Sequence, residues 1–243
     1  MKISIAQCAL IVVLIAGPSL RHSSIPPGQA PTSNDPLSRR VRLVGQAPAE
    51  VKLQNTTTFF ITRLIAVAGN PPGGFAIVKG CEDAEPEVQP LLPTDSTLGE
   101  ELDKLVAKDP GYTYSVDDGV VNLLPYQGAP PLLNARISGF DVEDESIGAP
   151  LLRLIDSPEV LKAKVSGGIT GTKRLQQFVG AQPAPPVPGR PKVEPKKFTL
   201  HLRNVTLMEA LNALVRAQGR GVWSYEEHIC NGEDWETIGL AWW

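Results

Sequence analysis

Two stretches of this chain, 109 residues apart, carry the same helical pattern. Residues 97–107 (TLGEELDKLVA) and 206–216 (TLMEALNALVR) share a threonine, a glutamate, three leucines and a valine at matching positions. At the same offset Tyr114 matches Trp223, so an aromatic residue recurs in the segment after each stretch. Leucine spacing of this kind arises easily by chance, but a matching start and a matching next segment do not. We therefore predict a duplicated structural unit.

Each repeated stretch begins with the residues of a capping box. Thr97 with Glu100, and Thr206 with Glu209, have the spacing at which the hydroxyl accepts a backbone N–H and the carboxylate reaches back to the cap. Leucines four and then three positions apart form one apolar face on each helix. The predicted core residues of the two copies are Leu98, Leu102, Leu105, Leu207, Leu211, Leu214 and Trp223.

The segments around the two helices predict a strand–helix–strand–strand unit in each copy. Residues 75–78 and 198–202 are the expected leading strands, and Asp118-Gly119 predicts a hairpin turn between two alternating runs. We expect an α+β fold in which helices pack on small mixed or antiparallel sheets. The second copy has about 47 residues, and chains that short rarely stabilise a core of their own, so it should either pack on the first copy or be held by a Cys81–Cys230 bond.

The first twenty residues predict export. Lys2 precedes an apolar run at 3–16, which a Gly-Pro-Ser break follows, as in a secretory signal peptide. A membrane-spanning helix needs about 20 apolar residues, so a permanent anchor is the weaker alternative. The mature protein is expected to be periplasmic or secreted, without a stable membrane span. The expected parts are a signal peptide at 1–20, a disordered leader at 21–40, a first α+β unit with added helices at 41–180, a proline-rich strap at 181–196 and a second α+β unit at 197–243.

Two segments of the first unit have further helical signals. Residues 51–68 predict a buried helix, with a strand as the alternative because β-branched residues are frequent there. Residues 150–165 predict two helical pieces, the second capped by Ser157 and starting at Pro158. Removal of the signal peptide would leave Cys81 and Cys230, which are a candidate disulfide in an oxidising compartment. The alternative is two separate buried thiols.

Residues 198–225 (FTLHLRNVTLMEALNALVRAQGRGVWSY) resemble the secretin and TonB-dependent-receptor N-terminal short domain, and residues 97–125 are a weaker echo of it. The resemblance implies a small α+β periplasmic module that serves as a protein docking or signalling domain beside an outer-membrane pore or receptor. It supplies no catalytic residues. No pore or barrel sequence follows this stretch, so the resemblance bears on fold and compartment more than on membership of a transport machine.

The chemistry-bearing residues indicate neither a catalytic site nor a metal site. The formal net charge of −3 excludes a nucleic-acid binder held by net positive charge. One local histidine and one cysteine, His228 and Cys230, are too few ligands for zinc, and the acidic residues near them, Glu227 included, are assigned to a solvated loop. No cofactor motif is found. The prediction is a non-enzymatic module that docks an unidentified envelope protein.

Exposed strand edges are the expected docking route, because they can add a partner strand. Trp242 and Trp243 form a second candidate contact surface. The alternative function is a secreted hydrolase or carbohydrate-active enzyme that uses acidic residues. Two carboxylates facing each other at about 5–10 Å in a pocket would favour this alternative.

Overall fold

The computed structural model describes residues 35–41, 57–80, 96–166, 174–178, 196–229 and 235–241. The predicted signal peptide and all but the last residue of the predicted strap lie outside these ranges. The helices are α1 (Thr57–Val67), α2 (Leu98–Lys108), α3 (Gly148–Ile155), α4 (Pro158–Ser166) and α5 (Leu207–Gln218), with short 3₁₀ turns η1 (Pro36–Ser38) and η2 (Pro131–Asn134). The strands are β1 (Gly73–Gly80), β2 (Tyr112–Asp117), β3 (Val120–Pro125), β4 (Arg136–Ser146), β5 (Arg174–Phe178), β6 (Lys197–Thr206), β7 (Val222–Ile229) and β8 (Trp235–Ala241).

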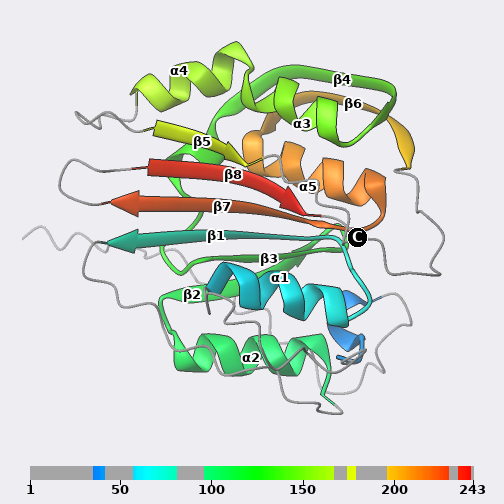
Figure 1. The fold of residues 1–243 in the computed structure, drawn as a ribbon, viewed down its shortest axis with the longest axis vertical. Coiled ribbons are helices and arrows are strands. Elements are labelled where there is room, and N and C mark those ends of the chain that lie inside the picture. The colour runs from blue at the N-terminus through cyan, green and yellow to red at the C-terminus, as the bar shows by residue number, and fades with distance from the viewer. Residues whose placement is uncertain are drawn as a thin grey trace, which may run out of the picture. The chain divides into compact units, whose positions relative to one another are not determined.

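The strands form two sheets within the described ranges, which confirms the predicted α+β class (Figure 1). A six-stranded mixed sheet has the order β2-β3-β1-β7-β8-β5, and β4 pairs with β6 in a two-stranded antiparallel ribbon. In the six-stranded sheet, β2–β3 and β7–β8 are antiparallel hairpins. A parallel strand lies beside the second strand of each hairpin, β1 next to β3 and β5 next to β8. The two copies join where β1 pairs with β7 in parallel.

The strand order adds a feature that the sequence did not predict. In the sheet, β5 occupies the place that β1 occupies beside the first hairpin. Residues 198–202 form the strand that precedes α5 in the chain, as predicted, but this strand, β6, pairs with β4 in the ribbon. Alternating apolar residues show that a strand has one buried face, but they do not show which strand it pairs with.

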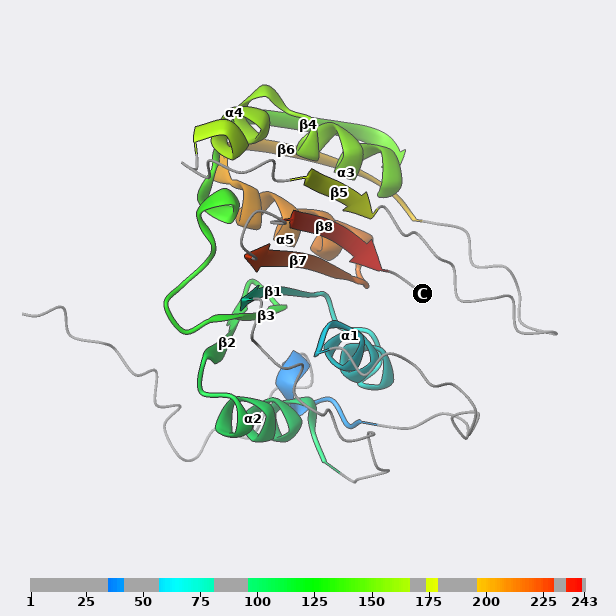
Figure 2. The same cartoon turned by 60° about the vertical axis from the view of Figure 1, so that its left-hand side comes forward.

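The two repeated helices lie on opposite faces of the six-stranded sheet (Figure 2). Side chains that alternate along each strand explain this: Phe75 and Val222 pack in the clusters of α1 and α2, whereas Ala76 and Trp223 pack in the cluster of α5. The helices lie on opposite faces because the corresponding strands of the two copies run in opposite directions. β2 runs opposite to β1 and β3, but its counterpart β7 runs with them. The second copy is therefore turned over relative to the first.

Helix α5 is buried on two sides, because the β4–β6 ribbon covers the side that faces away from the sheet (Figure 2). Eight residues of α5 are buried, against two in α2. The predicted core leucines Leu98, Leu102, Leu207, Leu211 and Leu214, together with Trp223, are buried. The remaining one, Leu105, is only partly buried and packs at the margin of the α2 clusters, since α2 has no second layer over it in the described ranges.

Three further local predictions can be compared with the structure. Residues 57–67 form a helix, so the strand alternative for that segment is wrong. Two helices do occupy 148–166, but the buried hydroxyl of Ser157 has no hydrogen-bond partner, so it does not cap α4 as predicted. Asp118 and Gly119 have the positive φ angles of the predicted hairpin turn.

The predicted disordered leader is ordered at its end. Residues 35–40 include η1, whose start is capped by the carboxylate of Asp35, and Leu37 packs against the cluster of Leu98 and Leu102. Val41, the first residue of the predicted first unit, is only 4% exposed in the same cluster. The backbone N–H of Val41 also donates to the carbonyl of Ser96 at 2.9 Å. Proline content indicated that no long helix or strand forms here, but it did not reveal that an apolar side chain of this segment packs on α2. No helix in the described ranges is long and apolar enough to cross a membrane.

Both capping boxes are present, and we expect the one on α5 to contribute measurably to stability. The Thr206 hydroxyl accepts the N–H of Glu209 at 3.1 Å, and the Glu209 carboxylate accepts the N–H of Thr206 at 2.6 Å. This backbone hydrogen bond holds the pKa of Glu209 below its usual value. Thr206→Ala should lower the free energy of unfolding by ~1 kcal/mol in urea denaturation at neutral pH.

Two comparisons make the capping experiment decisive. Thr206→Ser keeps the hydroxyl and should lie within a few tenths of a kcal/mol of the wild type, and equal losses for serine and alanine would contradict the capping role. Because the folded-state pKa of Glu209 is depressed, its contribution is present above the unfolded pKa and is lost as pH falls through the folded pKa. Alanine keeps the backbone hydrogen bond to Glu209 but removes the one that the Thr206 hydroxyl donates to the carboxylate at 3.0 Å, which also lowers this pKa. The difference between alanine and wild type should therefore shrink in acid.

Candidate functional site

Strand β2 forms one edge of the six-stranded sheet, and it is the best candidate for a docking site. Its sequence is YTYSVD, and among the described residues only β3 pairs with it. The pairing is regular from Tyr112 opposite Pro125 to Asp117 opposite Val120. The pairing of β2 with β3 therefore has no bulge over its six residues.

The hairpin turn determines which backbone groups of β2 point outward. A two-residue turn closes with a hydrogen-bonded pair, here Asp117 and Val120. Hydrogen-bonded pairs alternate along an antiparallel ladder, so the N–H and C=O groups of Tyr114 and Val116 point away from β3. Within the described part of the chain these groups have no bonding partner. They are the groups that an added strand would bind.

The side chains of β2 divide between the two faces of the sheet. Tyr112, Tyr114 and Val116 are partly buried against the α1 and α2 clusters, and the alternate side chains are exposed on the opposite face. The Tyr114 hydroxyl donates to the carboxylate of Asp103 on α2 at 2.6 Å. Burial and this carboxylate raise the pKa of Tyr114, so the phenol stays a neutral donor. The edge is thus held in place by α2.

The β4–β6 ribbon has a different surface, in which neighbouring charges are paired with each other. Asp141 accepts two hydrogen bonds from the Arg203 guanidinium at 2.8 and 3.0 Å, and its Oδ1 lies 2.9 Å from Nδ1 of His201. The hydrogen bond from Arg203, then that from His201, keeps the pKa of Asp141 low. The register of the ribbon also shifts between Val142 and Glu145. A bulge of this kind makes a strand edge a poor template for pairing.

A buried carboxylate pair lies on the sheet face that α5 covers. Glu227 on β7 is opposite Glu236 on β8, and one carboxylate oxygen of each lies 3.1 and 3.2 Å, respectively, from the Tyr225 hydroxyl. Both glutamates are 8% exposed. Burial, followed by the charges of Glu236 and Glu227, raises the pKa of Tyr225. Among neighbouring groups, burial also lowers the pKa of Lys164, a shift that the charges of Asp156 and Glu236 oppose.

The assignment of Glu227 to a solvated loop is therefore wrong. The signal that identifies it correctly is alternation, because Trp223, Tyr225 and Glu227 are two residues apart and so lie on one face of β7. No role was predicted for Glu236 from the sequence. Facing carboxylates meet one requirement of the hydrolase alternative, whereas their burial limits access by a substrate.

Four predicted site residues lie outside the described residues: Cys81, Cys230, Trp242 and Trp243. The last described pair between β1 and β7 is Gly80 opposite Ile229, the two residues that directly precede the cysteines in the sequence. A scan against models of protein families and searches of curated proteins and of solved structures found no match to this chain.

Proposed function

We propose that this chain is an exported, non-enzymatic docking module of the cell envelope, in which the open edge of β2 binds an extended segment of another envelope protein. The observation that carries this proposal is the regular edge at Tyr114 and Val116, whose outward backbone groups have no partner among the described residues. Strand addition to such an edge supplies main-chain hydrogen bonds, and neighbouring side chains supply specificity.

The sequence supports the compartment and the mode of action. The N-terminal pattern is typical of a signal peptide, and the repeated unit resembles a periplasmic docking domain. Helix α2 packs behind β2, and the Tyr114 to Asp103 hydrogen bond connects the two elements. A partner strand would therefore meet an edge that is already ordered, which lowers the entropy cost of binding.

A secreted hydrolase is the second candidate, and the observation that favours it is the facing pair Glu227 and Glu236. Each carboxylate is more than nine-tenths buried, and both contact the Tyr225 hydroxyl. A substrate could reach them only if the layer above moved. The docking proposal requires no rearrangement of the described residues, so it is preferred.

Val116→Pro should weaken docking without removing a hydrogen bond to β3. The Val116 N–H points outward, so proline deletes one donor of the edge, and proline is tolerated on edge strands. Loss of one main-chain hydrogen bond, ~1.4 kcal/mol, lowers affinity about tenfold. We expect quantitative affinity capture from envelope extract to recover a partner with the wild type and about tenfold less of it with the variant.

Val116→Thr is the matched control, because it keeps the N–H and a side chain of similar shape. It should recover the partner as the wild type does. Hydrogen exchange on the purified complex should show new protection at Tyr114 and Val116. Equal recovery by the proline and threonine variants, with no protection at these two amides, would show that β2 is not the docking edge.

A further inference from the structure

The open edge of β2 lies in an acidic part of the chain. Residues 100–118, which include most of α2, all of β2 and the first residue of its turn, contain six acidic and two basic residues, a formal charge of −4. The whole chain has a formal charge of −3, so all other residues together carry +1. The elements that form and support this edge therefore have a net negative charge.

Three carboxylates around the edge are hydrogen-bonded only to neutral donors. Asp103 accepts from the Tyr114 hydroxyl, and Asp109 accepts from the N–H of Gly111 at 3.1 Å. Asp117 accepts from the Ser115 hydroxyl at 3.1 Å and from the Asn122 side-chain amide at 3.0 Å.

These hydrogen bonds orient the carboxylates but leave their charges uncompensated. Within the described part of the chain, none of the three forms an ion pair. Asp118 at the turn differs, because Arg216 of α5 pairs with it. The edge therefore carries negative charge at both of its ends and beside its centre.

This charge disfavours a second copy of the chain as the occupant. Antiparallel pairing of two β2 strands about Tyr114 would place Asp117 of one copy opposite Gly111 of the other, two residues from Asp109. It would also bring the two acidic segments, each with a charge of −4, to the same interface. Like charges across paired strands are destabilising, and the negative field likewise repels nucleic-acid phosphates.

We propose that the segment docked on β2 is an extended strand rich in lysine or arginine. This inference rests on the proposed function and names the chemical class of its partner. The main chain of the strand would bind the outward groups of Tyr114 and Val116. Its cationic side chains on one face would reach Asp117, and those on the other face would reach Asp103 on α2. Long basic side chains suit these positions, because both carboxylates are exposed and already oriented by hydrogen bonds.

Blocked decapeptides with alternating sequences test the charge preference directly. The probes are acetyl-(Lys-Thr)₅-amide, acetyl-(Ser-Thr)₅-amide and acetyl-(Glu-Thr)₅-amide, measured by fluorescence anisotropy with the full mature chain. At about 20 mM salt, the lysine peptide should bind about tenfold more tightly than the serine peptide, and the glutamate peptide should bind most weakly. The difference between lysine and serine should narrow at about 150 mM salt, where exposed charges are screened.

Variants of the protein test whether Asp103 and Asp117 cause the preference for the lysine peptide. Asp103→Asn combined with Asp117→Asn keeps acceptor oxygens for the local hydrogen bonds but removes both charges. It should weaken binding of the lysine peptide about fivefold and leave the serine peptide unchanged. Glu143→Gln, an exposed position on β4, is the matched control and should change neither affinity. Hydrogen exchange with the lysine peptide bound should protect Tyr114 and Val116.

The outcomes separate this inference from the proposed function. Equal affinities for the three peptides, with protection at Tyr114 and Val116, would refute the basic partner while strand docking on β2 stands. A lysine preference that survives the double asparagine variant would place the site elsewhere and also refute the inference. A dimer in sedimentation equilibrium that Val116→Pro dissociates would identify a second copy as the occupant. Absence of binding by all three peptides would count against both proposals.

Discussion

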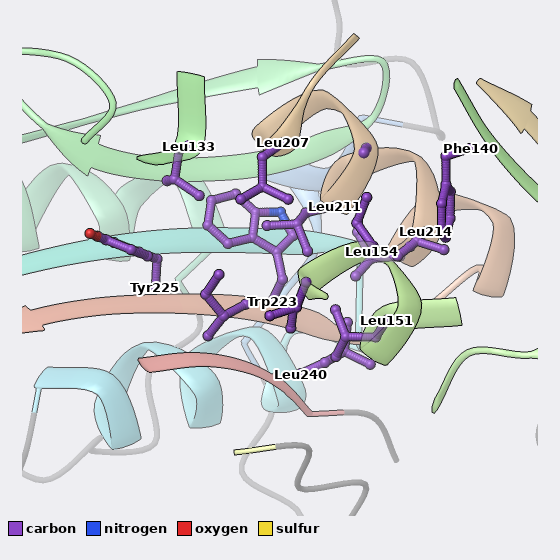
Figure 3. Packing of buried hydrophobic residues seen from close by; sticks show 14 of the residues in the cluster. Leu133, Phe140, Leu151, Leu154, Leu207, Leu211, Leu214, Trp223, Tyr225 and Leu240 are labelled. Atoms are coloured by element: carbon purple, nitrogen blue, oxygen red, sulfur yellow. The ribbon is translucent and has the colours of Figure 1, made fainter. Parts of the chain in front are cut away.

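Gly74→Ala is expected to lower the free energy of unfolding by ~2–6 kcal/mol, the largest effect that we expect for a methyl group at any of the described glycines. A Cβ atom at Gly74 would overlap the indole of Trp223 at three ring atoms. Trp223 is fully buried in the hydrophobic cluster that Figure 3 shows. Its Nε1 donates to the side-chain oxygen of Asn212 at 2.6 Å. The ring cannot move without breaking this bond. Overpacking costs ~1–3 kcal/mol, and a buried polar group left without its partner adds ~1–3 kcal/mol.

Gly148→Ala is the control for this experiment. A Cβ at Gly148 meets nothing within 4 Å, so its free energy of unfolding should stay within ~1 kcal/mol of the wild type. Both variants are compared by urea denaturation. A Trp223→Phe background adds a double-mutant cycle, because the smaller ring leaves room for the methyl group and should reduce the cost of Gly74→Ala. Similar stabilities for the alanine variants at Gly74 and Gly148 would contradict the close packing of β1 against Trp223.

Reduction of a Cys81–Cys230 disulfide is expected to destabilise the protein by ~5 kcal/mol, the value for a crosslink that closes a loop of about 150 residues. The cysteines lie outside the described residues, but the residues that precede them in the sequence are described. Gly80 and Ile229 are opposite each other in the β1–β7 pairing. Adjacent strands lie about 4.8 Å apart, which is inside the about 7 Å limit for α-carbons that a disulfide joins.

Intact mass and alkylation test this bond on protein purified from its exported form. The bonded protein should have two hydrogen atoms fewer than the reduced chain and should take up no alkylating reagent at Cys81 or Cys230 when unfolded without reductant. Reductant should lower the unfolding midpoint of the wild type and leave that of the Cys81→Ser, Cys230→Ser double variant unchanged. Alkylation of both cysteines in the absence of reductant would establish the alternative of two separate thiols.

Elements with strong local signals could be predicted from sequence. The capping boxes at Thr97 and Thr206 marked the helix starts, and Asp118-Gly119 marked the hairpin, because these patterns satisfy backbone requirements within a few residues. Pairing between distant strands has no such local signal. The placement of β6 in a ribbon with β4, and of β5 beside β8, therefore differed from the predicted unit.

The sequence predicted what kind of site to expect but not where in the fold it lies. Exposed strand edges were expected, and the alternation of β2 was visible in the sequence, but a sequence does not show which strand lies last in a sheet. The wrong prediction for Glu227 came from its neighbours in the sequence. Its neighbours in the sequence are polar and indicated a loop, whereas its neighbours in space are Tyr225 and Glu236.

The sequence by itself determined the repeated capped helix, its leucine face, the first hairpin and the α+β class, since each depends on residues close together in the chain. Only the tertiary structure decided that α2 and α5 cover opposite faces of one sheet, because the direction of β7 is set by its pairing with β1. It also decided that β2 is an edge and that the carboxylates of Asp103 and Asp117 flank it. Strand order and direction arise from the burial of faces contributed by the whole chain, which no local pattern encodes.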